Sequence, residues 1–205
     1  TNNGTFINNG TIKMNGQNTV GVYASSGTVI NQGDIIINGS GRGIAAYNNS
    51  HVILGVGSTI TINSSTQTYD GTETAADGTY VYVDSTSDVN NRGVITSDSR
   101  ITVDGNGKFV VNSVTGGLTA KRLVRNNNLY VGSEVTMNSS KDEYIYKNIN
   151  AEEITGNGRI LSDSIFFTAD TKKRNDDYQV SMKRKQFDQT VKGTLGEILE
   201  NNYAG

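Results

Sequence analysis

Residues 4–12 read GTFINNGTI and residues 27–35 read GTVINQGDI, so one pattern returns after 23 residues. The similarity extends beyond these two segments, because MNG at residues 14–16 matches ING at residues 37–39 with the same offset. A looser third copy contains ITIN at residues 60–63, which follows IIIN by 25 residues. Self-similarity at a period of about 20–50 residues is the signature of repeat architectures, so the repeat is the first guide to the fold.

Each copy consists of short β runs separated by turn residues. Apolar and polar residues alternate in TITI at residues 59–62 and in RITV at residues 100–103, as in strands with one buried face. Gly and Asn, which tolerate the backbone of tight turns, stand between the runs. No segment before residue 185 has a convincing helical period. We therefore expect residues 1–158 to form the rod of an all-β β-solenoid, with about seven turns by residue 168 and about 4.8 Å between turns.

Asparagine recurs with the same period as the strands. Asn8 and Asn31 are one period apart, as are Asn15 and Asn38, and Asn63 falls at the same position in the next copy. Stacked Asn side chains can hydrogen-bond along a rod as a ladder. Asn is also a turn former in its own right, and the sequence leaves both interpretations open.

One repeat is interrupted by a polar insertion at residues 66–79, which reads TQTYDGTETAADGT. A loop of this length inside a solenoid is expected to leave the rod. Exposed aromatic rings beside polar groups suit contacts with sugars or proteins. The candidate ligand-binding residues are therefore Tyr69, Asp70, Asp77 and Tyr80. The alternative is a disordered loop without a partner.

The pattern changes after Gly158, where the chain becomes more apolar. Residues 178–183 alternate strictly, which predicts one strand of a β-hairpin, and the charged residues 170–177 are expected to form a long turn before it. A solenoid without a cap exposes a strand edge and an open core at its last turn. We therefore expect residues 159–187 to form a capping hairpin.

Residues 188–205 carry a helical pattern. The apolar residues at the spacing of one helical face are Val191, Leu195, Ile198 and Leu199. Asp188 is a candidate N-cap, whereas Gly193 and Gly196 each weaken a helix by about 1 kcal/mol relative to Ala. The segment is expected to be one short, marginal amphipathic helix or linker.

Composition and charge exclude several classes of protein. Gly, Asn, Ser and Thr make up about 44% of the chain, and there is no Pro, Cys or Trp. The lack of Cys excludes a disulfide framework, a zinc ribbon and thiol catalysis. A formal net charge of −2 argues against a nucleic-acid binder that works through bulk charge. No apolar run approaches the roughly 18–20 residues of a membrane helix.

The sequence contains no recognisable catalytic or metal-binding motif, and we predict no catalytic residue, no metal and no cofactor. His51, the single histidine, would have to be the base of any Ser-His-Asp site, and no G-x-S-x-G elbow accompanies it. Glycoside cleavage requires two facing carboxylates. The candidates Asp84, Asp88, Asp98 and Asp104 lie near predicted turns, where Asp is common for local backbone reasons.

Basic residues gather at residues 121–125, 172–174 and 183–185. Charges placed near exposed strand edges hinder edge-to-edge aggregation. The alternative is contact with an acidic lipopolysaccharide or glycan.

Residues 10–24, which read GTIKMNGQNTVGVYA, resemble the repeats of large autotransporter adhesins, especially the fusobacterial type. In those passengers Gly-Thr-Ile, Asn-Gly and Gly-Val/Ile-Tyr-Ala recur along a right-handed parallel β-helix. Residues 167–184 resemble the autochaperone junction that closes such passengers. Residues 195–200, LGEILE, resemble the helical segment that leads into the translocator barrel. The resemblance covers almost the whole chain and implies a right-handed parallel β-helix with a C-terminal hairpin cap and a short terminal helix.

The same resemblance implies a role at the cell surface. The chain would be the barrel-proximal passenger segment of a type Va autotransporter, tethered to the outer membrane of a Gram-negative bacterium, and cut from a longer protein. It would serve as stalk and folding cap of a virulence adhesin that binds a protein or glycan on host cells or other bacteria. Its own translocator barrel would be a further partner; neither nucleic acid nor membrane insertion by this segment is expected.

We expect no enzymatic activity, and two alternative functions stay open. One is a β-helical polysaccharide-active enzyme with carboxylates gathered in a groove. The other is a module that self-associates in aggregation or biofilm.

Overall fold

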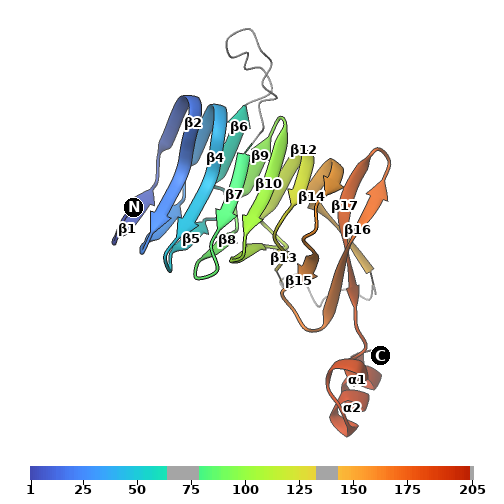
Figure 1. Cartoon of the computed structure of the whole chain (residues 1–205). Coiled ribbons are helices and arrows are strands. Elements are labelled where there is room, and N and C mark those ends of the chain that lie inside the picture. The colour runs from blue at the N-terminus through green and yellow to red at the C-terminus, as the bar shows by residue number, and fades with distance from the viewer. Residues whose placement is uncertain (64–78, 133–142, 204–205) are drawn as a thin grey trace.

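A computed structural model describes residues 1–63, 79–132 and 143–203 as a parallel β-helix that ends in an antiparallel hairpin and a helical tail (Figure 1). The predicted all-β solenoid with a hairpin cap and a terminal helix is confirmed.

One face of the rod is a seven-stranded parallel sheet to which each turn contributes one strand. Its strands are β1 (Thr5–Asn8), β3 (Thr28–Asn31), β5 (His51–Leu54), β8 (Asp88–Asn91), β11 (Lys108–Val111), β13 (Leu129–Val131) and β15 (Ile160–Ser162). Seven strands confirm the seven turns expected from the repeat period.

The rest of the wall belongs to a ten-stranded sheet that bends around the core. Its strands are β2 (Thr11–Ser25), β4 (Asp34–Tyr47), β6 (Thr59–Asn63), β7 (Thr79–Val83), β9 (Val94–Ser97), β10 (Arg100–Gly105), β12 (Gly117–Arg125), β14 (Glu143–Thr155), β16 (Phe167–Arg174) and β17 (Asp177–Arg184). The first half of β4 pairs with β6 and its second half with β7, so one long strand serves two faces. In the same way, the first part of β12 pairs with β9 and its second part with β10.

The core is built from columns of inward-facing residues, one from each turn. In the seven-stranded sheet one column runs through Phe6, Val29, Val52, Val89, Phe109, Leu129 and Ile160. All of these side chains are buried except Phe6, which is 46% exposed at the N-terminal end of the stack. Period-2 alternation along each strand thus becomes a continuous apolar interior along the rod.

Of the two interpretations of the periodic asparagines, the structure supports the ladder. The Asn8 Nδ2 donates to Asn31 Oδ1 at 2.8 Å inside the rod. On the outer surface Asn38 Nδ2 donates to Asn15 Oδ1 at 2.9 Å, and Asn63 Nδ2 donates to Asn38 Oδ1 at 3.0 Å. The period of Asn in the sequence therefore reflects contacts between turns.

The buried ladder is expected to matter more than the exposed one. Asn31→Ala should lower the free energy of unfolding by about 1–3 kcal/mol, because it leaves the buried amide of Asn8 and the half-buried carbonyl of Gly33 without their partner. Asn38→Ala should cost less than about 0.5 kcal/mol, since water can replace its partners. Urea denaturation of both variants checks the difference, and equal losses would contradict a structural role for the buried ladder.

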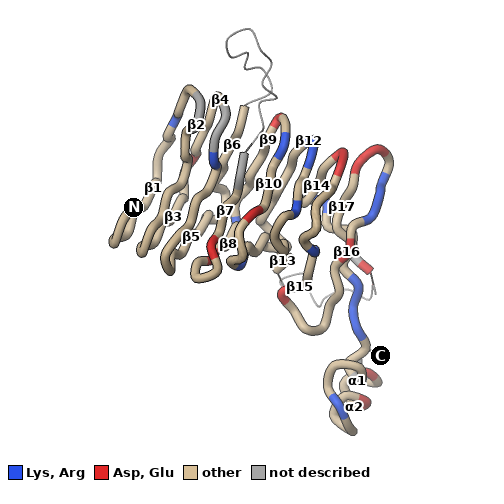
Figure 2. The backbone as a smooth tube through the Cα atoms, in the orientation of Figure 1, with Lys and Arg blue, Asp and Glu red and all other residues tan. Residues whose placement is uncertain are grey.

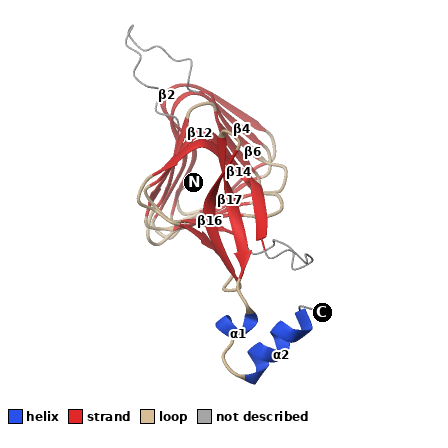
Figure 3. Cartoon of the chain, turned by 90° about the vertical axis from the view of Figure 1, so that its right-hand side faces the viewer, coloured by secondary structure: helices blue, strands red, loops and turns tan. Residues whose placement is uncertain are grey.

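The hairpin that ends the rod consists of β16 and β17, which cross the open end of the stack (Figure 3). Strand β17 pairs antiparallel with β14, and its Val180 and Met182 are fully buried against the core. The expected long turn at residues 170–177 is wrong. Strand β16 continues to Arg174, and the turn holds only Asn175 and Asp176. Charged side chains are compatible with this strand because it lies at the edge of the sheet.

The basic residues lie on several parts of this end of the molecule (Figure 2). Residues 172–174 lie in the edge strand β16, which agrees with the protection of an exposed edge. Residues 121–125 lie in β12, and Lys183 lies in β17, which pairs on both sides. Edge protection therefore accounts for one of the three clusters.

The helical tail differs from the single helix expected over residues 188–203. Helix α1 (Phe187–Thr190) ends at Val191, whose backbone is extended, and helix α2 (Thr194–Tyr203) begins after Gly193, whose φ is +92°. Asp188 lies inside α1, and Gln186 takes the N-cap position instead. In the described residues, neither helix is long and apolar enough to cross a membrane.

Candidate binding surface

Three of the four predicted binding residues, Tyr69, Asp70 and Asp77, lie outside the described residues. The fourth, Tyr80, lies in β7, where its backbone is in register with Arg42 of β4 and Thr102 of β10. The insertion therefore rejoins the rod on the face formed by β7 and the second half of β4.

The outer surface of that face carries a row of aromatic rings that sequence reasoning missed. The ring centroids of Tyr23 and Tyr47 lie 6.0 Å apart, and those of Tyr47 and Tyr82 lie 5.1 Å apart. The Tyr23 side chain points outward because its neighbours Val22 and Ala24 fill the core. We call Tyr23, Tyr47 and Tyr82 the tyrosine row.

An arginine fixes the middle of the tyrosine row. Arg42 Nη1 donates to the Tyr47 hydroxyl at 2.6 Å, and its guanidinium carbon lies 5.9 Å from the Tyr82 ring centroid. A cation over an aromatic ring is attracted by the ring quadrupole. Tyr23 itself is 50% exposed. The row therefore offers apolar ring surface, a hydroxyl and a cation to solvent, which is the chemistry of sugar and protein contacts.

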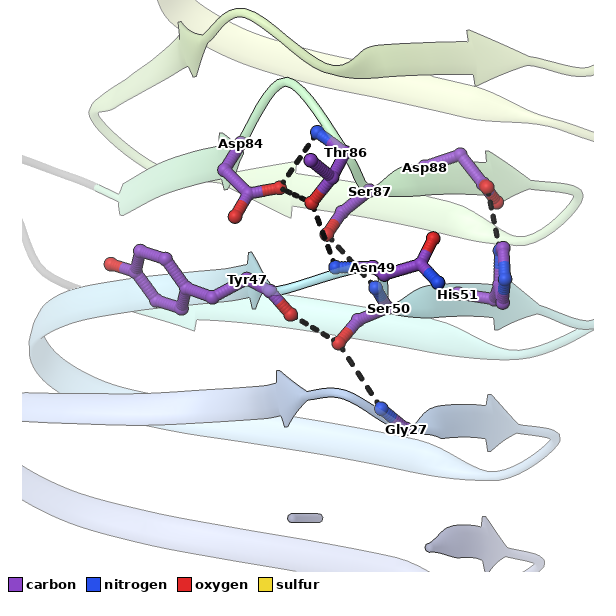
Figure 4. Close-up of polar contacts among 9 residues, drawn as sticks. All are labelled: Gly27, Tyr47, Asn49, Ser50, His51, Asp84, Thr86, Ser87 and Asp88. Atoms are coloured by element: carbon purple, nitrogen blue, oxygen red, sulfur yellow. Dashed lines mark hydrogen bonds and ion pairs between the residues drawn. The ribbon is translucent and has the colours of Figure 1, made fainter. Parts of the chain in front are cut away.

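Beside the tyrosine row lies a corner of the rod, where β4 is followed by β5 and β7 by β8. Polar contacts between turns hold this corner (Figure 4). Asp84 accepts hydrogen bonds from the backbone N–H of Asn48 at 2.7 Å and of Thr86 at 3.0 Å. Burial raises the pKa of Asp84, but the hydrogen bonds from Asn48, Ser87 and Thr86 outweigh it and lower the pKa overall. The Asp84 carboxylate therefore joins two neighbouring turns through its hydrogen bond with Asn48.

Ser50 directly precedes β5 and His51 is its first residue, and their side chains lie on opposite sides of the wall, Ser50 inside and His51 outside. Ser50 is fully buried, and its hydroxyl donates to the Tyr47 carbonyl and accepts from the Gly27 N–H at 3.3 Å. His51 Nδ1 lies 2.6 Å from Asp88 Oδ2 on the outside of the rod (Figure 4). The serine is therefore used in packing, while the His51–Asp88 pair joins β5 to β8.

The four candidate carboxylates are distributed over two turns. Asp84 and Asp88 flank one corner turn and bind Asn48 and His51 respectively. Asp98 follows β9, and Asp104 lies in β10, where its Oδ1 accepts from the Gly105 N–H at 2.8 Å. Within residues 1–63, 79–132 and 143–203, no group of three or more His, Cys, Asp or Glu side chains is placed to hold a metal ion.

The tail is attached to the hairpin through one carboxylate. Glu200 accepts hydrogen bonds from Arg184 at 2.9 and 2.8 Å and from the backbone N–H of Phe187 at 2.7 Å. The hydrogen bonds from Arg184, followed by that from Phe187, lower the pKa of Glu200 to about 2. The ring of Phe187 also packs against Phe166, with centroids 5.3 Å apart.

Acid is expected to release α2 from the hairpin. The folded pKa of about 2 lies below the ordinary 4.5, so this carboxylate stabilises the docked tail fully above about pH 4.5. That stabilisation is lost as the pH falls toward 2. The hydrogen-exchange protection of the Phe187 amide should decrease over this interval while that of Val180 persists. Glu200→Gln should reduce protection of Phe187 already at neutral pH, and full protection in this variant would contradict the assignment.

Comparison of the chain with protein-family models, with curated proteins and with solved structures gives no significant match.

Proposed function

We propose that this chain is a rod-and-cap segment of a surface-displayed adhesin of the autotransporter type. The observation that carries the proposal is the order of parts along the chain. A seven-turn stack with one continuous core is followed by an antiparallel hairpin across its end and then by a short helical tail. This order is the one that the resemblance of residues 10–24, 167–184 and 195–200 implies.

The hairpin would act as a folding template for the rod. Turns of a solenoid are stabilised mainly by their neighbours, so a stable terminal unit favours the formation of the next turn. Val180 and Met182 connect the hairpin to the core, since both are fully buried and β17 pairs with β14. The hairpin therefore presents a preformed strand edge and an apolar surface to turn six.

Refolding of the whole chain tests this role. Val180→Asp should slow refolding from denaturant and increase tryptic cleavage within residues 79–132, because a buried unpaired charge disrupts the cap. Thr168→Asp, at an exposed site of β16, is the matched control. Unchanged refolding in Val180→Asp would remove the templating role.

The tyrosine row and the insertion would provide the contact surface. Binding of the purified chain to host cells, to bacteria and to a glycan panel should be saturable. It should be reduced by deletion of residues 67–78 or by Tyr23→Ala and Tyr82→Ala together. Tyr130→Ala, on β13 of the seven-stranded face, is the control. Binding that survives both changes would place recognition elsewhere, and absence of binding would leave the segment as stalk and cap.

A further inference from the structure

A cleft of about 670 Å³ lies between the last turns of the rod and the hairpin. Its walls come from the end of β12, the starts of β14 and β15, and the two hairpin strands β16 and β17. Small-molecule sites commonly have volumes of about 300–1,000 Å³. The cleft therefore has the size of a binding site and brings together five separate elements.

The lining of the cleft is predominantly cationic. Four basic side chains, Arg125, Arg159, Lys172 and Lys183, face two carboxylates, Glu143 and Asp170. The chain as a whole has a formal net charge of −2. A positive excess in a cleft of an acidic protein focuses the field on that site and attracts anions.

Part of the positive charge of the cleft is already compensated by its two carboxylates. Glu143 Oε1 accepts from Lys172 Nζ at 2.8 Å and from Ser181 Oγ at 2.6 Å. The hydrogen bonds from Lys172 and Ser181 lower the pKa of Glu143 to about 2, so this pair stays ionised and mutually neutralised. Burial lowers the pKa of Arg125, and the attraction of Asp170 opposes this effect without cancelling it.

Two cations stay available to a ligand. Arg159 and Lys183 are exposed side chains of the cleft wall. Within the described part of the chain neither has an ion-pair partner within 4.0 Å, although Lys183 contributes to the field at Glu143. A guanidinium binds a carboxylate or sulfate in a fork of two hydrogen bonds, and an ammonium adds a point charge.

The remaining wall favours a sugar over a compact, densely charged anion. Thr168 and Thr171 supply hydroxyl groups, and Asp170 is an exposed carboxylate that can accept hydrogen bonds from sugar hydroxyls. The same carboxylate repels a dianion such as phosphate. Ile160 and Ala169 add a small apolar strip. Acceptors, hydroxyl groups and free cations together match a saccharide that carries isolated acidic groups.

We propose that this cleft binds an acidic saccharide, with its anionic group between Arg159 and Lys183 and its hydroxyl groups against Asp170. The inference goes beyond the proposed role of the rod and does not depend on it, because the cleft is separate from the tyrosine row. It assigns to the hairpin end a binding activity in addition to capping.

Calorimetric titration of the full chain with trigalacturonate tests the proposal, with maltotriose as the neutral counterpart. Saturable binding is expected for trigalacturonate alone. Binding should be weaker at about 150 mM salt than at about 10 mM salt, because the screening length is about 8 Å at the higher concentration and about 30 Å at the lower one. A heparin tetrasaccharide serves as a second probe and distinguishes sulfate from carboxylate as the preferred group.

The variants Arg159→Gln and Lys183→Gln should each weaken binding about tenfold, as expected for loss of one charged hydrogen bond. Arg122→Gln removes an exposed charge of β12 outside the cleft and is the matched control. Melting curves establish that all three variants fold. The proposal is overturned by no saturation with either acidic probe, by equal binding of maltotriose, or by an equal loss in Arg122→Gln.

Discussion

Replacing Phe109 with alanine is expected to lower the free energy of unfolding by about 3–5 kcal/mol. Phe109 is fully buried and is among the largest side chains in the core. Its column neighbours are Val89 and Leu129, which belong to the adjacent turns and are also fully buried or nearly so. The cavity left by the ring would therefore remove contacts within the turn of Phe109 and contacts with the turn on either side of it. Guanidinium denaturation followed by far-ultraviolet circular dichroism measures the loss.

The chain supplies a matched control for this experiment. Phe6 occupies the same column of the same sheet, but it lies in the first turn and is 46% exposed. Phe6→Ala should cost less than about 1 kcal/mol, because the ring already contacts water and no closed cavity forms. Similar losses in the two variants would show that the column does not carry the continuous core described above.

Replacing Gly105 with alanine is expected to cost about 2–5 kcal/mol, from two sources that act together. The φ of +92° is strained for a residue with a side chain, which costs about 1–3 kcal/mol. An added Cβ would also lie 2.0 Å from the carbonyl oxygen of Val83 in the preceding turn. That atom belongs to the backbone, so relief requires a shift of one turn against the next, at a further cost of about 1–3 kcal/mol.

Gly10→Ala is the control for Gly105→Ala. A Cβ at Gly10 would meet no atom within 4 Å, and Gly10 is not among the glycines with positive φ. The substitution should be neutral or stabilise the protein by about 0.4–1 kcal/mol through the entropy of the unfolded chain. Thermal unfolding of both variants gives the comparison. A Gly105→Ala variant as stable as Gly10→Ala would contradict the tight stacking of turns at this corner.

Repetition made the rod predictable from the sequence. Each turn repeats one local rule, so an offset of 23 residues in GTFINNGTI and GTVINQGDI already gives the register that pairs Phe6 with Val29 and Asn8 with Asn31. The asparagine ladders followed from the same arithmetic. Errors began where repetition stops. Residues 170–174 form a strand although they are mostly polar or charged, because only pairing with β17 holds them extended.

The candidate site was less predictable because its parts do not share one register. Tyr23 aligns with Ala45 and Tyr82, whereas Tyr47 lies two residues further along β4, and its ring reaches back between the other two. A search for equal spacing therefore overlooks the tyrosine row. The only available signal was a tyrosine near the end of three successive repeats. The cationic cleft could not be predicted from the sequence for a similar reason, because only the crossing hairpin brings Lys183 into the same cleft as Arg125.

The stacking of turns also determines how the chain responds to force. Backbone hydrogen bonds between turns run along the rod axis, so a pull on its two ends strains the few bonds that join the outermost turn to its neighbour. Turns would then peel away in sequence instead of resisting together as strands do under shear. Each detached turn of about 23 residues would release about 80 Å of extended chain. Under tension the rod would behave as an extensible tether that lengthens stepwise at low load.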